Sequence, residues 1–353
     1  MPFLSGFGKR KAIKYGTVFP GSNLTDFPKL IKITTDADIA AELTGTHLAV
    51  TEADGTTLVP HGLYPSSNPA AGTIILRAKF PTLLTAASTG DVLGYLYYDD
   101  GGTDQEDKAG VMDGNYALFM PLEEDPSGSS PQMLDWVTET NRGASVGSMT
   151  SGDLVAAQVA NGLDLDGSND AIDISSFSLG TNVLTMEIAA YSSNFNQSSM
   201  LFGKEVVNSA WSMRLESTLL KINGGSSGGS LTTARPSDST WHALAATITG
   251  TTGRIYYDGV EQTNGTVSAV SDGSDVLSVG RYSGFGGGYY FTGIVDEVRI
   301  SNVVRSADWL AYAYDDDFDN ADTFSLGAEE TDGGGVARSS VVHSQAIQTS
   351  LFF

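Results

Sequence analysis

Hydrophobic and polar positions alternate most regularly in residues 241–262. Leu244, Ala246 and Ile248 fall on one face at a period of two residues, the repeat of a strand with one buried face. An Asp-Gly pair at 258–259 then separates two further strand-like runs, and this dipeptide is typical of a two-residue hairpin. The pattern predicts three antiparallel strands in succession.

Similar strand-like runs, separated by turns rich in glycine, proline, asparagine and aspartate, recur along most of the chain and predict an all-β fold. They form two blocks, so we expect two tandem β-sandwich domains, at residues 17–115 and 116–330. Residues 1–16 are expected to form an N-terminal arm. Residues 331–353 are expected to form a flexible, glycine-rich tail.

Composition excludes several classes of protein. The 353 residues contain no cysteine, so neither a disulfide framework nor a thiolate metal site is possible. The 19 basic and 42 acidic residues give a net charge of −23, which repels nucleic acid and anionic membranes. No apolar run has membrane-spanning length, and the N-terminus lacks the pattern of a signal peptide. We therefore expect no nucleic-acid partner, no membrane insertion and no export by the general secretory route.

Basic residues are concentrated near the N-terminus, where Lys9, Arg10, Lys11 and Lys14 lie within six positions. Two interpretations stay open. The cluster docks the arm onto an acidic partner, or it belongs to a frayed terminus.

Four motifs in the second block occur in the order typical of one family. They are the run Leu165-Asp166-Gly167-Ser168-Asn169-Asp170, the pair Trp241-His242, the hairpin Tyr257-Asp258-Gly259, and the strand at 293–300. With these motifs the block resembles the concanavalin A-like, or laminin-G-like, jelly roll. The resemblance implies two antiparallel sheets packed face to face, one of them concave.

The first block resembles an uncharacterised β-domain family, through the run Leu24-Thr25-Asp26-Phe27-Pro28 and the run Tyr95-Leu96-Tyr97-Tyr98. Asp99 and Asp100 follow where that family usually has glycine. The pairing of the two domains is similar to that in bacteriophage and prophage proteins. This resemblance implies a non-catalytic structural and binding component of a virion, either a tail fibre or a head decoration. Its partners would be other virion proteins, further copies of itself and host-surface polysaccharide.

Catalysis is not expected from the sequence. Glucanases of the jelly-roll class carry paired carboxylates at alternate positions of one strand, and this chain has no such motif. Asp296 and Glu297 are adjacent, so strand alternation predicts that they point to opposite faces. A Ser-His-Asp arrangement stays open because it is assembled in space, although His242 is expected to be structural. The alternatives to a virion protein are a glycan hydrolase and a bacterial surface adhesin.

A calcium site is a candidate in the Asp-Gly-Ser-Asn-Asp segment. Asp166, Asn169 and Asp170 offer the hard oxygen ligands that calcium prefers. The same residues also form an ordinary turn, in which their side chains cap its backbone. Both interpretations stay open.

A glycan site is predicted in the aromatic segment after residue 281. Tyr282, Phe285 and Tyr289 are separated by glycines at the end of a predicted strand, and aromatic rings in such loops are suited to stacking on sugars. The alternative is that these rings pack the loop itself or a neighbouring subunit.

Two further features lie near the C-terminus. A short helix is expected at 306–314, with Ser306 as its N-cap. The chain ends Leu351-Phe352-Phe353 after a glycine-rich segment. We expect this apolar end to dock into another chain or subunit, with a disordered end as the alternative.

Overall fold

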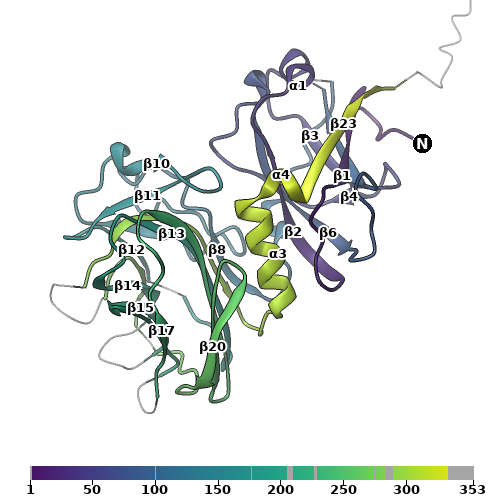
Figure 1. The fold of residues 1–353 in the computed structure, drawn as a ribbon. Coiled ribbons are helices and arrows are strands. Elements are labelled where there is room, and N and C mark those ends of the chain that lie inside the picture. Colours follow the sequence, from purple (N-terminus) through teal and green to yellow (C-terminus); the bar gives the residue numbers. More distant parts are fainter. Residues whose placement is uncertain are drawn as a thin grey trace, which may run out of the picture.

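The computed structural model describes residues 2–99, 101–175, 177–204, 210–225, 229–273, 275–282 and 289–332. They form four antiparallel sheets in two lobes, with a yellow helix, α3 (Ala307–Phe318), between them (Figure 1). The all-β fold expected from the sequence is confirmed. No helix in the described part is long and apolar enough to cross a membrane.

The first lobe contains a five-stranded and a three-stranded sheet around one core. In order across the larger sheet, the strands are β23 (Phe324–Thr331), β1 (Lys9–Tyr15), β7 (Val92–Tyr98), β3 (Leu48–Glu52) and β4 (Leu58–Val59). The smaller sheet contains β2 (Leu24–Ile33), β6 (Ile74–Leu83) and β5 (His61–Leu63). Short helices α1 (Ala37–Glu42) and α2 (Lys108–Val111) and a 3₁₀ turn (Pro69–Ala71) connect these strands.

The second lobe packs an eight-stranded sheet against a seven-stranded sheet. The first contains β10 (Leu154–Ala156), β11 (Asn161–Asp166), β22 (Thr292–Ser301), β13 (Val183–Ser192), β18 (Thr240–Thr249), β19 (Thr252–Tyr257) and β20 (Val260–Thr266), with β8 (Tyr116–Met120) also paired to β22. The second contains β17 (Leu231–Ala234), β16 (Leu219–Asn223), β15 (Ser212–Ser217), β14 (Gln197–Gly203), β21 (Leu277–Val279), β12 (Ala171–Ile174) and β9 (Ala144–Val146). A 3₁₀ turn (Ser151–Asp153) precedes β10.

The three-strand succession predicted at 241–262 is confirmed as β18, β19 and β20. Leu244, Ala246 and Ile248 are fully or almost fully buried in the core between the two sheets. Asp258 and Gly259 both have positive φ, at 49° and 74°, as a two-residue hairpin turn requires.

Two expected domain boundaries are wrong. Residues 9–15 of the predicted arm form β1, which lies between β23 and β7 in the five-stranded sheet. The strand β23 was expected to close the second domain but pairs with β1 instead. The partners are Lys9 with Thr331 at one end and Tyr15 with Phe324 at the other. Both strands are short and rich in charge, so the local pattern does not reveal a pairing across more than 300 positions.

Three of the four basic residues of β1, namely Lys9, Arg10 and Lys11, pair with acidic residues of the same chain. Lys9 pairs with Glu329, and Arg10 pairs with Glu330 at 2.6 Å. Lys11 lies 2.6 Å from a carboxylate oxygen of Asp36, the N-cap of α1. The first two contacts join β1 to β23 and the third joins it to the start of α1, so this part of the cluster is neither a frayed end nor a free docking arm.

Candidate functional site

A pocket of about 200 Å³ opens where the predicted aromatic segment meets β14 and β15. Met200, Arg214, Glu216, Tyr282 and Tyr289 line it, together with Ser199 and Leu215. The two tyrosine rings are 6.0 Å apart between centroids and inclined by 54°. Tyr289 is 45% exposed, whereas Tyr282 is largely buried, so one ring supports the pocket and the other faces its opening.

Strand pairing explains why the other lining side chains converge. Met200 of β14 lies opposite Arg214 of β15, and Glu216 follows Arg214 by two positions, so all three are expected on one face of the sheet. The Met200 amide also donates to the Tyr289 carbonyl at 3.3 Å. This bond holds Tyr289 beside β14 although 89 positions separate the two residues.

Charged groups form the polar side of the pocket. Arg214 lies 2.9 Å from a carboxylate oxygen of Glu216, and Lys221 of β16 lies 3.0 Å from the same oxygen. Together with the tyrosines, these groups present apolar ring faces beside hydrogen-bond donors and acceptors. That combination suits sugars, which have apolar C–H faces and a rim of hydroxyl groups.

Two of the three predicted glycan-binding residues, Tyr282 and Tyr289, are therefore brought together. Phe285 lies outside the described residues. The sequence did not point to Met200, Arg214 or Glu216, because their approach depends on strand register. The alternation of Arg214 and Glu216 along one strand was the only local signal available.

The residues predicted to bind calcium form a turn whose side chains accept hydrogen bonds from its own backbone. Asp166 accepts hydrogen bonds from the amides of Ser168 and Asn169 at 2.7 and 3.1 Å. The Asp170 carboxylate accepts from the Asp166 amide at 3.3 Å. Within the described ranges, no group of three or more histidine, aspartate or glutamate side chains has a metal-binding arrangement. Calcium at Asp166, Asn169 and Asp170 stays a prediction.

The prediction that Asp296 and Glu297 face opposite ways is wrong. The register of β22 on β13 shifts by one residue here, and Glu297 has φ of 55°. Val295 and Val298 consequently both point into the core of the second lobe. A bulge of this kind places both intervening acidic residues on the same, outer face.

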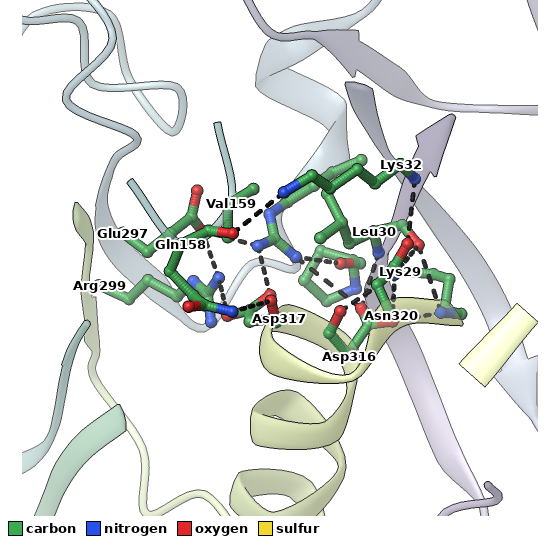
Figure 2. Close-up of polar contacts among 12 residues, drawn as sticks. Lys29, Leu30, Lys32, Gln158, Val159, Glu297, Arg299, Asp316, Asp317 and Asn320 are labelled. Atoms are coloured by element: carbon green, nitrogen blue, oxygen red, sulfur yellow. Dashed lines mark hydrogen bonds and ion pairs between the residues drawn. The ribbon is translucent and has the colours of Figure 1, made fainter. Parts of the chain in front are cut away.

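Glu297 meets basic residues of both lobes in a buried network (Figure 2). Arg77 of β6 lies 2.7 Å from Glu297 and 2.6 Å from Asp317 of α3. Arg299 of β22 also contacts Glu297, and it lies 2.6 Å from Asp317. The Tyr64 hydroxyl donates to Glu297 at 2.5 Å. Glu297 and Asp317 are each held between Arg77 and Arg299, whereas Asp296 accepts the Val159 amide at 3.0 Å. The network therefore joins the two lobes.

A second buried polar contact joins β2 of the first lobe to the end of α3. Lys29 of β2 pairs with Asp316, and its ammonium donates to Thr323 at 2.6 Å. The Leu30 amide donates to the other Asp316 oxygen at 2.7 Å. Figure 2 shows Lys29, Leu30 and Asp316 gathered where β2 meets the helix. Burial lowers the pKa of Lys29, although Asp316 opposes that shift.

A Ser-His-Asp arrangement, left open by the sequence, is present at the start of β18. His242 Nε2 lies 2.9 Å from Ser237 Oγ, and His242 Nδ1 lies 2.8 Å from Asp258 Oδ2. The other oxygen of Asp258 accepts the Ala243 amide at 3.0 Å. Trp241-His242 and the Asp-Gly hairpin were identified separately in the sequence, but Ser237 was not.

Comparison with known proteins concerns mainly the second lobe. Residues 166–311 match the family described as the concanavalin A-like lectin/glucanases superfamily. No curated protein matches the chain.

Solved structures that resemble the chain do so at low identity. The binding domain of Paraclostridial Mosquitocidal Protein 1 is 12% identical, with a TM-score of 0.43 and coverage of 57% of this chain and 52% of that one. The receptor binding domain of botulinum neurotoxin D gives the same values. Domain 4 of AbnA, a GH43 extracellular arabinanase from Geobacillus stearothermophilus in complex with arabinotriose, is 15% identical, with a TM-score of 0.42 and coverage of 56% and 97%.

The chain thus spans about half the length of the first of these structures. The family match and the two packed sheets together identify the C-terminal part of this chain as a concanavalin A-like jelly-roll domain.

Proposed function

We propose that this chain is a structural and binding protein whose jelly roll holds a glycan in the Tyr282–Tyr289 pocket. The observation that carries the proposal is the pocket itself, in which an exposed tyrosine ring stands beside Arg214 and Glu216. The ring stacks on the apolar face of a sugar, and the charged groups bond its hydroxyls. Specific polar contacts fix the orientation of such a ligand.

The proposed role of the pocket is binding without cleavage of the glycosidic bond. Glycosidases need two carboxyl groups that flank the bond. Among the described lining residues, Glu216 is the one carboxylate, and Arg214 and Lys221 already engage it. A hydrolase at this pocket would need a second acid.

The proposed setting is a bacteriophage virion, as a tail fibre or head decoration that docks on other virion proteins and on copies of itself. This part of the proposal is supported by the resemblance of the domain pairing to phage and prophage proteins. Immunogold labelling of particles induced from a lysogen that carries the gene is expected to mark the head or the tail. Labelling of the host envelope instead would favour the adhesin alternative.

The binding proposal is tested by glycan arrays followed by calorimetry on the best glycan. Tyr289→Ala is expected to weaken binding about tenfold, because an aromatic stacking contact contributes roughly 0.5–1.5 kcal/mol. Tyr289→Phe keeps the ring and is expected to bind nearly as the parent does. Tyr191→Ala, a half-buried tyrosine on β13, is the matched control. Equal binding by Tyr289→Ala, or no glycan bound by the parent protein, would refute the proposal.

The calcium prediction is tested in the same calorimetric assay. If Asp166, Asn169 and Asp170 hold calcium that supports the fold or the pocket, a chelator is expected to lower the melting temperature or the glycan affinity. Asp170→Asn is expected to abolish that response. An unchanged melting temperature and an unchanged glycan affinity in chelator would refute the calcium prediction.

A further inference from the structure

We propose that Ser237, His242 and Asp258 form an acyl-transfer site that hydrolyses carboxylic esters. Its geometry is that of a nucleophile, a base and a group that orients the base. The serine-to-histidine and histidine-to-aspartate contacts measure 2.9 and 2.8 Å, both within the reach required for proton transfer and orientation. This activity goes beyond the proposed binding function and uses other residues.

The orienting residue is itself fixed on two sides. Asp258 Oδ1 accepts the Ala243 amide, which leaves Oδ2 for the imidazole. Asp258 also has φ of 49° in the tight β19–β20 turn, which limits its freedom. With Oδ2 accepting from Nδ1–H, the lone pair of His242 lies on Nε2, facing the serine hydroxyl. That tautomer is the one a general base needs.

The nucleophile is open to solvent and the base is buried, as a substrate-accessible catalytic serine would require. Ser237 is exposed in the segment that precedes β18, whereas His242 is 8% exposed. The Phe195 ring packs edge-on against the imidazole, with centroids 5.9 Å apart and planes at 72°. A substrate can therefore reach the hydroxyl while the imidazole is held in place.

The contacts also suggest a substrate class. Phe195 packs against Phe291 as well, with centroids 6.2 Å apart, and Phe291 follows Tyr289 by two positions. Both rings are fully buried, so they support the imidazole from the core side, and an ester reaches the site at the exposed hydroxyl of Ser237. Access at a surface hydroxyl suits a small carboxylic ester.

The reaction proceeds in two balanced steps. Ser237 Oγ attacks the ester carbonyl carbon while its proton passes to His242 Nε2, and collapse of the tetrahedral intermediate expels the alcohol, which takes that proton. Water then attacks the acyl-serine, again losing a proton to His242. Collapse returns this proton to Ser237 and releases the carboxylic acid. No oxidant, reductant or metal is required.

Two measurements on the full chain test the inference. A serine-directed phosphonate probe is expected to add one adduct per chain, mapped to Ser237 by peptide mass spectrometry. Hydrolysis of p-nitrophenyl acetate is expected to fall at least about 100-fold in Ser237→Ala and in Asp258→Asn, since the latter disturbs the tautomer. Ser230→Ala, another exposed serine nearby in the chain, is expected to behave as the parent.

Ser237 is exposed, so its alanine variant is expected to fold, and a thermal melt checks this. Absence of an adduct at Ser237 overturns the inference. Equal hydrolysis by folded Ser237→Ala also overturns it. The three residues would then only brace β18 against the β19–β20 turn. Neither result bears on glycan binding at Tyr289, because Ser237 does not line that pocket.

Discussion

At the scale of single residues, the surroundings of each carboxylate decide what it does. The acids of the calcium segment bond their own turn, and Glu297 lies between two arginines. Asp296 is fully buried beside Glu297, and burial raises its pKa well above the usual range. Acidic side chains that look alike in the sequence therefore have separate structural roles.

Glu124, just after β8, gives a prediction on pH dependence. Burial raises its pKa from 4.5 to about 7, so between these pH values the unfolded chain is ionised while the folded chain keeps its proton. Stability from this residue is present below about pH 4.5 and is lost as the pH rises to about 7. Glu124→Gln is expected to raise the free energy of unfolding at pH 8 by up to about 3 kcal/mol, with little change at pH 4.

Chemical denaturation at the two pH values measures this effect. The exposed Glu139→Gln is the matched control and is expected to change stability at neither pH. A parent-like free energy of unfolding for Glu124→Gln at pH 8 would show that the carboxylate is better solvated than its position indicates.

At the scale of elements, the placement of β23 decides how the sheet of the first lobe is completed. It pairs along the length of β1, and it extends the first lobe's sheet with the last described residues of the chain. Lys9 and Arg10 take their carboxylate partners from it. The first lobe is therefore completed only after the whole jelly roll has been made.

Truncation tests this dependence. A chain that ends at residue 332 keeps every described strand and is expected to melt as the full chain does. A chain that ends at residue 323 loses β23, which exposes the edge of β1. It is expected to show rapid proteolysis of the first lobe and a lower melting temperature. Equal protease resistance of the two chains would mean that β23 is dispensable.

At the scale of the whole molecule, the two lobes are expected to move as one unit. Helix α3 contributes Trp309 and Tyr312 to the first lobe's core, against Phe27 of β2. The buried ion pairs of Arg77 and Lys29 then cross from the first lobe to β22 and α3. Apolar contacts therefore fix α3 to the first lobe, and ion pairs join that lobe to α3 and β22.

Removing one member of the buried network tests how much the network contributes to the free energy of unfolding. Arg77→Met leaves Glu297 and Asp317 short of a cation, and such a loss typically costs 3–5 kcal/mol. Arg254→Met removes a solvent-exposed pair with Glu261 and is expected to have no measurable effect. Comparable denaturation curves for the two variants would contradict the structural role of the network.

Assembly is also a property of the whole chain. We expect the apolar end Leu351-Phe352-Phe353 to support a homo-oligomer, as the sequence suggests, although these residues lie outside the described part. Mass photometry of the full chain and of a chain ending at residue 332 compares the two with β23 intact. Oligomers formed only by the full chain would support docking by the tail. Monomers in both samples would refute it.

Much of the fold was predictable because it depends on local pattern. The alternation at 241–262 and the Asp-Gly turn predicted β18, β19 and β20. Ser306 caps α3 as expected, with its hydroxyl accepting the Trp309 amide at 3.1 Å, although the helix continues to Phe318. In the proposed glycan site, Tyr282 and Tyr289 were identifiable as aromatic residues of one segment.

By itself, the sequence determined the all-β class, the aromatic segment and the excess of negative charge, since each follows from residue type and spacing. The jelly roll was expected from the resemblance of the sequence motifs to a known family. Only the tertiary structure decided the pairing of β1 with β23, the bulge at Glu297 and the approach of Arg214 to the tyrosines. Those arrangements join residues distant in sequence or depend on a one-residue shift of register. Neither long-range contacts nor register shifts can be recognised in the local pattern of hydrophobic and polar positions.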